Sequence, residues 1–170
     1  VAQILEARVI AAAAGLRLPL VYNTGGYDSP EALALLDGVV DIYMPDMKYG
    51  DSDLARRYSH VREYVQADRR AVREMHRQVG DLVLDEHGVA VRGLLVRHLV
   101  LPGDVAGTDQ VLAWIASEIS PDTYVNLMAQ YRPCYRAWEH PPLDRRLTLA
   151  EYRRARELAG RLGLVRLDPG

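Results

Sequence analysis

Short apolar runs alternate with amphipathic segments along most of the chain. Each apolar run is bounded by turn-forming residues, the pattern that predicts buried strands. Four strands are predicted on this basis, at Leu18–Tyr22, Val39–Met44, Leu94–Leu101 and Thr123–Met128. Apolar residues at helical spacing predict helices at 1–16, 30–36, 65–79, 108–119 and 148–162, and a short one after Asp51. A hairpin is predicted at 82–91, with its turn at His87 and Gly88, and an irregular, proline-containing segment at 132–142.

Three helix starts carry capping signals, one of them Asp51 before a short helix. Ser29 precedes Pro30 and Glu31, which places a capping side chain, a proline at the first helical position and an acid in the first turn. Thr148 and Glu151 have the spacing of a capping box. The first helix has no such residue before it, and the sequence lacks the basic start and the cleavage site of a signal peptide. We therefore expect further residues upstream of the first helix in the complete protein.

The order of elements predicts an α/β fold in a single domain over residues 1–170. Strands that alternate with helices form parallel βαβ units, whose crossovers are right-handed. Four strands are too few to close an eight-stranded barrel, so a half barrel and a doubly wound sheet both stay open at this point. In either architecture, ligands bind beyond the carboxyl ends of the strands. Functional side chains are expected at that edge.

Composition excludes several classes of function. The 170 residues include 21 basic and 23 acidic side chains, a net charge of −2, which gives no electrostatic reason to expect nucleic acid or an anionic membrane surface. No apolar run reaches the length of about 18 residues that a membrane span needs. The one cysteine, Cys134, leaves no internal disulfide and no CxxC pair for zinc or a cluster, and it fits a reducing, cytoplasmic compartment.

Polar side chains accompany all four predicted strands near their ends. They are Asn23 and Thr24, Asp46 and Lys48, Arg97 and His98, and Gln130, Tyr131 and Arg132. Asp46 and Lys48 are two residues apart and therefore share one face of the extended chain. Together they could bind a zwitterion, with its ammonium at Asp46 and its carboxylate at Lys48, or they could form an internal salt bridge. The spacing favours neither interpretation over the other.

Arg97 lies inside an apolar strand, where a guanidinium is costly unless it is paired or faces a ligand. We favour a ligand over a structural carboxylate as its partner. Its neighbour His98 points to the opposite face and is interpreted as a packing histidine. Gln130 has the donors and acceptors to read an amide or a purine edge, and Cys134 is interpreted as a bystander thiol. The other histidines show no metal-ligand spacing, so no metal site is predicted.

Three segments of the sequence contain these strand-end residues. They are VYNTGGYDSPEALALLDGVVDIYMPDMKYGD, VRGLLVRHLVLPG and DTYVNLMAQYRPCYRA. Their combination closely resembles the C-terminal part of pyruvate formate-lyase activating enzymes of the radical S-adenosylmethionine superfamily, and the likeness extends from about Val1 to Leu167. The resemblance implies a partial (β/α)6 TIM-like barrel with parallel strands. This chain would supply its later strands, without the segment that binds the cluster.

The resemblance also implies a cofactor chemistry. Members bind a 4Fe-4S cluster on a CxxxCxxC loop, which this chain lacks, and S-adenosylmethionine chelates the open iron. A flavodoxin- or ferredoxin-type reductant supplies one electron, the cofactor is cleaved to methionine and a 5′-deoxyadenosyl radical, and the radical abstracts a hydrogen atom. Relatives take that hydrogen from a glycine of a glycyl-radical enzyme. We therefore expect S-adenosylmethionine, a cluster held outside these residues, and a polypeptide substrate.

Cofactor-binding roles carry over at the matching positions. Asp46 and Lys48 match an Asp-x-Lys near the methionine end of the cofactor, where Lys48 would contact its carboxylate. Arg97 matches an arginine on the next barrel strand that assists there. Gln130 falls where a relative has a histidine near the adenine. No catalytic residue is assigned.

A monovalent-cation site is implied next to the cofactor. In relatives an Asp-Thr pair forms it, together with the aspartate matched by Asp46 and the backbone matched by Met44. In this chain the pair is Asn23 and Thr24. The asparagine removes one negative charge from the implied site.

Two other functions fit the same residues. A barrel aldolase or related lyase would use Lys48 as a Schiff-base nucleophile with Asp46 as its acid–base partner, and it would need no cluster. A non-catalytic binding domain or remnant would use the same pocket without chemistry. Trapping of Lys48 by borohydride favours the lyase, and failure of the complete protein to bind a cluster favours the remnant.

Overall fold

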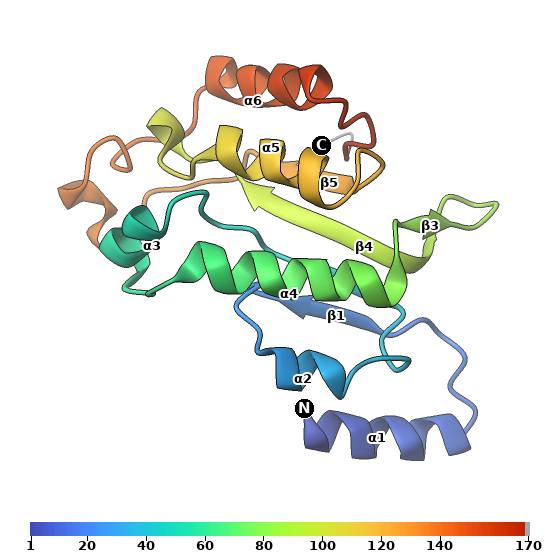
Figure 1. Cartoon of the computed structure of the whole chain (residues 1–170). Helices are drawn as coiled ribbons and strands as arrows, with labels where there is room; N and C mark the ends of the chain where they lie inside the picture. Colours follow the sequence, from blue (N-terminus) through green and yellow to red (C-terminus); the bar gives the residue numbers. More distant parts are fainter. Residues whose placement is uncertain (169–170) are drawn as a thin grey trace.

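Four parallel strands form the centre of the molecule (Figure 1). The computed structural model describes residues 1–168. The parallel strands, in spatial order, are β1 (Val21–Thr24), β2 (Ile42–Pro45), β4 (Ala90–Leu99) and β5 (Tyr124–Met128). A two-residue strand, β3 (Val83–Leu84), pairs antiparallel with the start of β4, and Leu167 forms a parallel bridge to Val125 on the other side of β5. The chain is therefore a mixed α/β protein built on a parallel sheet.

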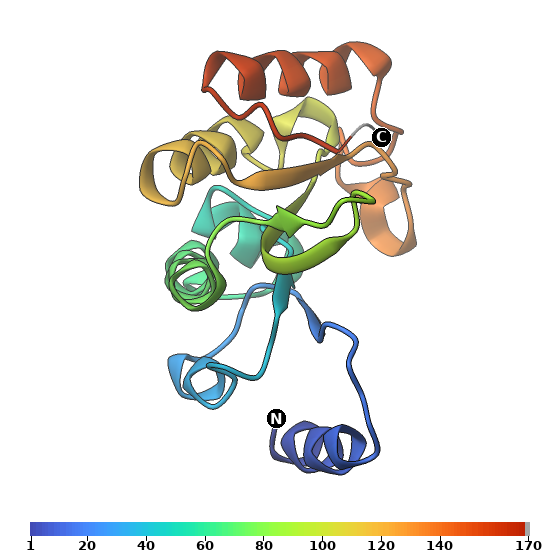
Figure 2. The same cartoon turned by 90° about the vertical axis from the view of Figure 1, so that its right-hand side faces the viewer.

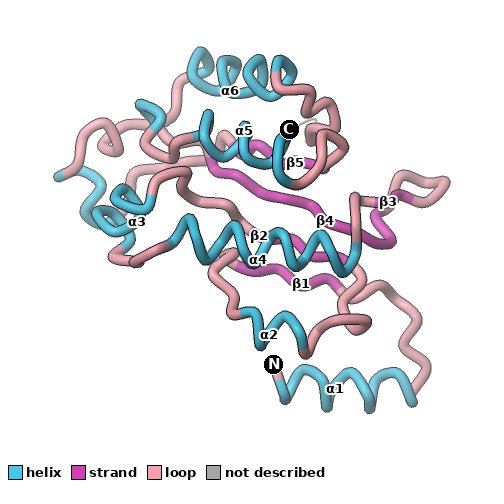
Figure 3. The backbone as a smooth tube through the Cα atoms, in the orientation of Figure 1, coloured by secondary structure: helices cyan, strands magenta, loops and turns pink. Residues whose placement is uncertain are grey.

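Helices connect the strands in the order that the sequence predicts (Figure 3). The α-helices are α1 (Ala2–Ala13), α2 (Pro30–Ala34), α3 (Ser52–Ser59), α4 (Tyr64–Val79), α5 (Thr108–Glu118) and α6 (Leu149–Arg161). Two 3-10 segments, η1 (Pro102–Asp104) and η2 (Tyr135–Glu139), lie in the connections after β4 and β5. The second of these is a helical turn inside the stretch for which the sequence predicts irregular structure. In residues 1–168 no helix combines the length and the apolar character needed to cross a bilayer.

Side-chain caps are found where the sequence predicts them. Ser29 Oγ accepts a hydrogen bond from the backbone N–H of Ala32 at 3.2 Å. Asp51 caps α3 in the same way, and Thr148 and Glu151 form the reciprocal capping box of α6. Each cap satisfies backbone donors that a helix leaves unpaired at its N-terminus. These helix starts are thus fixed by local sequence.

Helices cover one face of the parallel sheet. Figure 2 shows α2, α4 and α5 on the same side of the strands, with α6 packed on α5. The strand side chains that belong to the main core are buried, among them Tyr43, Leu94, Val96, Val125 and Leu127. They share this core with residues of α4 and α5, including Val72, Met75, Leu112 and Ile115. The alternate side chains of β4 are only partly buried, among them Leu95, Arg97 and Leu99. The sheet thus has one packed face and one more open face.

β4 is longer than the sequence predicts. The pattern indicates a hairpin arm followed by a separate strand, whereas the structure has one ten-residue strand. Gly93 joins the two parts with φ 115°, and a Cβ at this residue would lie 2.3 Å from Asp81 O. A glycine lets the backbone pass this close to Asp81 while the first half of β4 pairs with β3 and the second with β5.

α1 forms as predicted, but its apolar side chains are not covered. Val9 and Ile10 are 65% and 71% exposed, and no residue of α1 is fully buried. Leu5 packs at the edge of the main core as a partly buried side chain. In Figure 1 the helix lies below α2, at the end of the molecule that is far from α6. Helical spacing predicts which side chains share a face, and tertiary packing decides whether that face is covered.

Candidate functional site

A pocket of about 810 Å³ opens at the carboxyl ends of β2, β4 and β5. This is the edge where the sequence predicts ligand binding. The floor of the pocket includes Asp46 and Lys48 after β2, Arg97 of β4, and Met128 and Gln130 from the end of β5. Its wall comes from α3 and from the segment 131–143, which lie together at the left of Figure 1. The fold therefore gathers four of the six candidate residues in one pocket.

Asp46 is held between two cationic side chains. Its Oδ1 accepts a hydrogen bond from Arg97 Nε at 2.7 Å and forms an ion pair with Arg97 Nη2 at 2.6 Å. Its Oδ2 accepts a hydrogen bond from Lys48 Nζ. Asp46 and Arg97 are both partly buried, so this pair is less screened by water than a surface pair. The internal salt bridge is present, and Arg97 has a carboxylate partner without a ligand. Two cations against one carboxylate leave a net positive charge at the strand ends.

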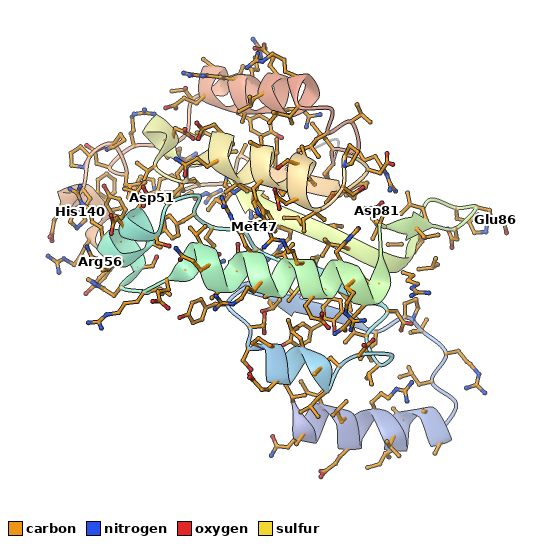
Figure 4. The ribbon with its side chains drawn as sticks, in the orientation of Figure 1. Met47, Asp51, Arg56, Asp81, Glu86 and His140 are labelled. Carbon is orange, nitrogen blue, oxygen red and sulfur yellow. The ribbon has the colours of Figure 1, made fainter. Side chains whose placement is uncertain are left out.

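His98 fixes the Asp46–Lys48 turn from the helix-covered side of the sheet. The ring is fully buried, with Nδ1 at 2.6 Å from Met47 O and Nε2 at 2.9 Å from Thr108 Oγ1. A carbonyl oxygen only accepts, so Nδ1 carries the proton and Nε2 accepts from the Thr108 hydroxyl. Burial lowers the pKa of His98, in keeping with a neutral ring. The packing role predicted for His98 is confirmed. Met47 is itself buried, and Figure 4 shows it between α4 and α5.

Tyr64, the first residue of α4, holds the same turn by a second contact. Its hydroxyl accepts the backbone N–H of Lys48 at 2.8 Å and donates to Asp46 O at 3.1 Å. The side chain is buried, and burial raises the pKa of Tyr64, so the phenol stays protonated and able to donate. Sequence reasoning missed this residue. A tyrosine at a helix start is typical of a core aromatic, and only the fold brings it to a turn 16 residues away.

A buried carboxyl group lies behind the turn. Asp68 of α4 is fully buried, and within residues 1–168 neither of its carboxyl oxygens has a hydrogen-bond partner. Burial raises the pKa of this carboxyl well above its usual range, which favours the neutral acid. Gly26 approaches it closely: a Cβ at Gly26 would lie 2.1 Å from Asp68 Oδ1 and 2.6 Å from Asp46 O. With φ 81° as well, position 26 fits only glycine.

Asn23 and Thr24 lie on β1, one strand away from the pocket, and neither lines it. Successive strand residues point to opposite faces, so these two side chains diverge. The Thr24 hydroxyl donates to Asp28, and Asn23 is exposed and lies beside Met44 of β2 in the pairing register. The two side chains therefore lie on opposite faces of β1, beside the strand end that carries Met44 and Asp46.

The wall of the pocket carries side chains that sequence reasoning did not select. They are Tyr49, Arg57, Tyr58 and His60 from α3 and its flanks, and Tyr135, Arg136 and His140 from the later segment. Tyr58 meets the edge of His140, with ring centroids 5.8 Å apart, which joins the two parts of the wall. Cys134 also lines the pocket and is exposed. The strand-end rule identified the region, but these residues follow no strand-end pattern.

Comparison with known proteins gives one informative match. No family model matches the chain, and no solved structure matches it. An uncharacterized protein of Methanocaldococcus jannaschii is 34% identical over 148 residues. The match covers 86% of this chain and 39% of the relative, so the chain spans about two fifths of the relative's length. Because the relative is uncharacterized, the match assigns no function to this chain.

Proposed function

We propose that this chain forms part of the S-adenosylmethionine site of a radical S-adenosylmethionine enzyme of the pyruvate formate-lyase activating type. The observation that carries the proposal is the convergence of four residues on one pocket, from three neighbouring parallel strands: Asp46, Lys48, Arg97 and Gln130. The sequence resemblance assigns each of them to cofactor binding. Residues that meet only through the fold give that resemblance independent support.

The sheet, in this proposal, is the C-terminal part of a partial (β/α)6 barrel. Helices cover one face of the sheet, and the side chains of β4 on the other face are partly exposed. A doubly wound sheet has helices on both faces, whereas a barrel has them on its outside alone. The one-sided cover therefore favours the barrel over the doubly wound sheet.

The strand-end side chains suit the amino-acid portion of S-adenosylmethionine. The Lys48 side chain is 47% exposed and keeps two of its three N–H donors after bonding Asp46, so it can bind a carboxylate. Asp46 Oδ2 keeps a second lone pair for an ammonium group. Lys48 is also the one lysine of the chain, in which every other basic residue among the 21 is arginine. A lysine at this one position indicates that its compact ammonium group makes a specific contact, because arginine supplies positive charge everywhere else.

The residues of this chain bind and orient the cofactor, which supplies a 5′-deoxyadenosyl radical when bound and reduced by one electron. Lys48 and Arg97 hold the carboxylate, Asp46 receives the ammonium group, and the amide of Gln130 lies on the β5 side for the adenine. An iron–sulfur cluster does not fit these residues, because the sequence has one cysteine and residues 1–168 hold no group able to bind a metal. We assign the cluster, and the flavodoxin- or ferredoxin-type reductant that serves it, to residues outside this chain.

Binding of S-adenosylmethionine to Lys48 variants tests the proposal. Isothermal titration calorimetry of the 170-residue chain is expected to show saturable binding that Lys48→Ala weakens at least about tenfold, because one charge-assisted hydrogen bond is worth about 1.5–3 kcal/mol. Lys48→Arg keeps the charge with a different shape, and its affinity is expected to lie between the two. Arg154→Ala removes an exposed arginine of α6 and is the control. An affinity unchanged by Lys48→Ala would contradict the assignment.

The Schiff-base lyase is less well supported by the geometry. A nucleophilic lysine must be uncharged, which calls for a desolvated pocket. The Lys48 side chain is 47% exposed and is bonded to Asp46, so it does not lie in such a pocket. Borohydride reduction in the presence of pyruvate, followed by peptide mass mapping, tests for a Schiff base. Because the chain has one lysine, the mapping needs to distinguish two amines, those of Lys48 and Val1. A stoichiometric adduct at Lys48 would favour the lyase.

A further inference from the structure

The wall of the pocket has no part in cofactor binding as proposed, yet it concentrates positive charge. It contributes four basic side chains, Arg57, His60, Arg136 and His140. Among the described residues that line the pocket, Asp46 is the one carboxylate, and it is already bonded to Lys48 and Arg97. The chain as a whole has two more acids than lysines and arginines. A basic pocket in an acidic chain indicates an anionic ligand.

Arg57 is the wall cation best placed to bind that ligand. Its guanidinium lies over the Tyr58 ring, 5.2 Å from the centroid, and no acidic side chain within residues 1–168 forms an ion pair with it. Arg136, by comparison, is bonded to Glu139 at 2.7 Å. Tyr58 is in turn held edge-on against His140. A guanidinium that rests on a ring keeps the donors in its plane free for a carboxylate or a phosphate.

One wall residue, Tyr135, holds a left-handed backbone conformation at the start of η2, with φ 50°. His60 has φ 57°, but it is the C-cap of α3, where left-handed residues are common. The Tyr135 side chain is 89% exposed, so burial does not impose its conformation. Residues strained in this way cluster at ligand-binding sites. The strain therefore occurs on the same wall as the charge.

The pocket has the volume of a small-molecule site. Its volume of about 810 Å³ lies within the range of about 300–1,000 Å³ found for small-molecule sites. The floor at the strand ends is assigned to S-adenosylmethionine. Beyond the floor, the wall offers the rings of Tyr49, Tyr58 and Tyr131, which can pack against a flat apolar body.

We infer that the wall binds the substrate of this site, and that the substrate is a small molecule with a flat apolar body and a carboxylate or phosphate group. The inference rests on the proposed function, because it names the substrate of that same pocket. Arg57 binds the anionic group, and the tyrosine rings pack against the body.

Three flat probes test the inference on the 170-residue chain at low salt, by isothermal titration calorimetry. Benzoate carries a carboxylate, phenyl phosphate carries a phosphate, and benzamide is the neutral control. At least one anion is expected to bind saturably, at least about tenfold more tightly than benzamide, because the charge-assisted bonds need the anion. Which anion binds identifies the group. Arg57→Gln is expected to remove this advantage, and Arg154→Gln, an exposed arginine of α6, is expected to leave it unchanged.

Absence of saturable binding by both anions, or equal losses in Arg57→Gln and Arg154→Gln, overturns the inference. Circular dichroism shows whether each variant is folded. S-adenosylmethionine titrations of the same variants separate the two proposals, because Arg57→Gln is expected to leave cofactor affinity unchanged. Cofactor binding without anion binding refutes the wall site alone. Anion binding that depends on Arg57, without cofactor binding, supports the wall site and refutes the proposed function.

Discussion

Tyr64 stabilises the turn that carries Asp46 and Lys48 through a single hydroxyl group. Tyr64→Phe keeps the ring in the core but leaves the Lys48 N–H and the Asp46 carbonyl without their partner. A buried polar group that loses its partner costs about 1–3 kcal/mol. We therefore expect the free energy of unfolding, measured by urea denaturation, to fall by about that amount.

An exposed tyrosine provides the matched control for this prediction. Tyr135→Phe removes a hydroxyl from a side chain that is 89% exposed, so the free energy of unfolding is expected to change by less than about 0.5 kcal/mol. Equal effects of Tyr64→Phe and Tyr135→Phe would show that the turn does not depend on the Tyr64 hydroxyl.

Asp68 is expected to make stability fall as the pH rises. Burial raises the pKa of its carboxyl in the folded protein above about 3.9, the value of an unfolded aspartate. The folded state then binds the proton more tightly than the unfolded state, so this stabilisation is complete below about pH 4 and is lost as the pH rises toward the raised pKa. Asp68→Asn cannot ionise. We expect the variant to be more stable than the parent at about pH 7 and similar to it near pH 4.5.

Urea denaturation at the two pH values measures this difference. Glu157→Gln, which removes an exposed acid on α6, is the control and is expected to change stability little at either pH. A stability difference between Asp68→Asn and the parent that does not vary with pH would contradict the prediction. It would indicate that Asp68 is ionised in both the folded and the unfolded state over this range.

At the scale of elements, α4 and α1 are predicted to differ most in local stability. α4 contributes Val72 and Met75 to the main core, whereas no residue of α1 is fully buried. Segments with few buried contacts open locally without global unfolding. In hydrogen-exchange experiments on dilute protein, we expect α1 amides to exchange at least about a hundredfold faster than central α4 amides. Equal protection of the two helices would contradict this expectation.

Elements with strong local signals were the easiest to predict from the sequence. The caps at Ser29 and Thr148 fixed two helix starts to within one residue, because the capping groups are neighbours in the chain. The sequence did not predict that β4 continues through Gly93. Only the close approach of Asp81 to Gly93 shows why two apolar runs form one strand. Local chemistry predicts where an element begins, and contacts between distant segments decide how far it extends.

The residues of the candidate site also fall into those that the sequence predicts and those that it does not. Asp46, Lys48, Arg97 and Gln130 were predictable, because parallel strands bring their carboxyl ends to one edge. Tyr64 and Arg57 lie on helices, and no periodicity marks them as neighbours of that edge. Their positions follow from the crossovers that place α4 against the sheet and α3 against α4, and those depend on packing across the whole molecule.

At the scale of the whole molecule, one end of the sheet and the helix beside it are predicted to drive self-association. β1 pairs with β2 on one side only within residues 1–168, and Val21 on it is half-exposed. Val9 and Ile10 of α1 add exposed apolar surface near the same end. Open strand edges and contiguous apolar patches both favour contacts between chains. We expect species heavier than the 19.1 kDa monomer in sedimentation velocity, increasing with concentration.

Charged substitutions on α1 test whether self-association occurs through this surface or through nonspecific hydrophobic contacts. The double variant Val9→Glu and Ile10→Glu is expected to shift the distribution toward monomer, because two carboxylates would have to be desolvated in any contact through this face. Leu149→Glu is the control: it removes a side chain that is 62% exposed at the first position of α6, far from α1, and an acid is favoured there. If the control reduced association as much as the double variant, the contact would not be specific to α1. A parent protein that stayed monomeric at all concentrations would show that the open end of the sheet is tolerated in solution.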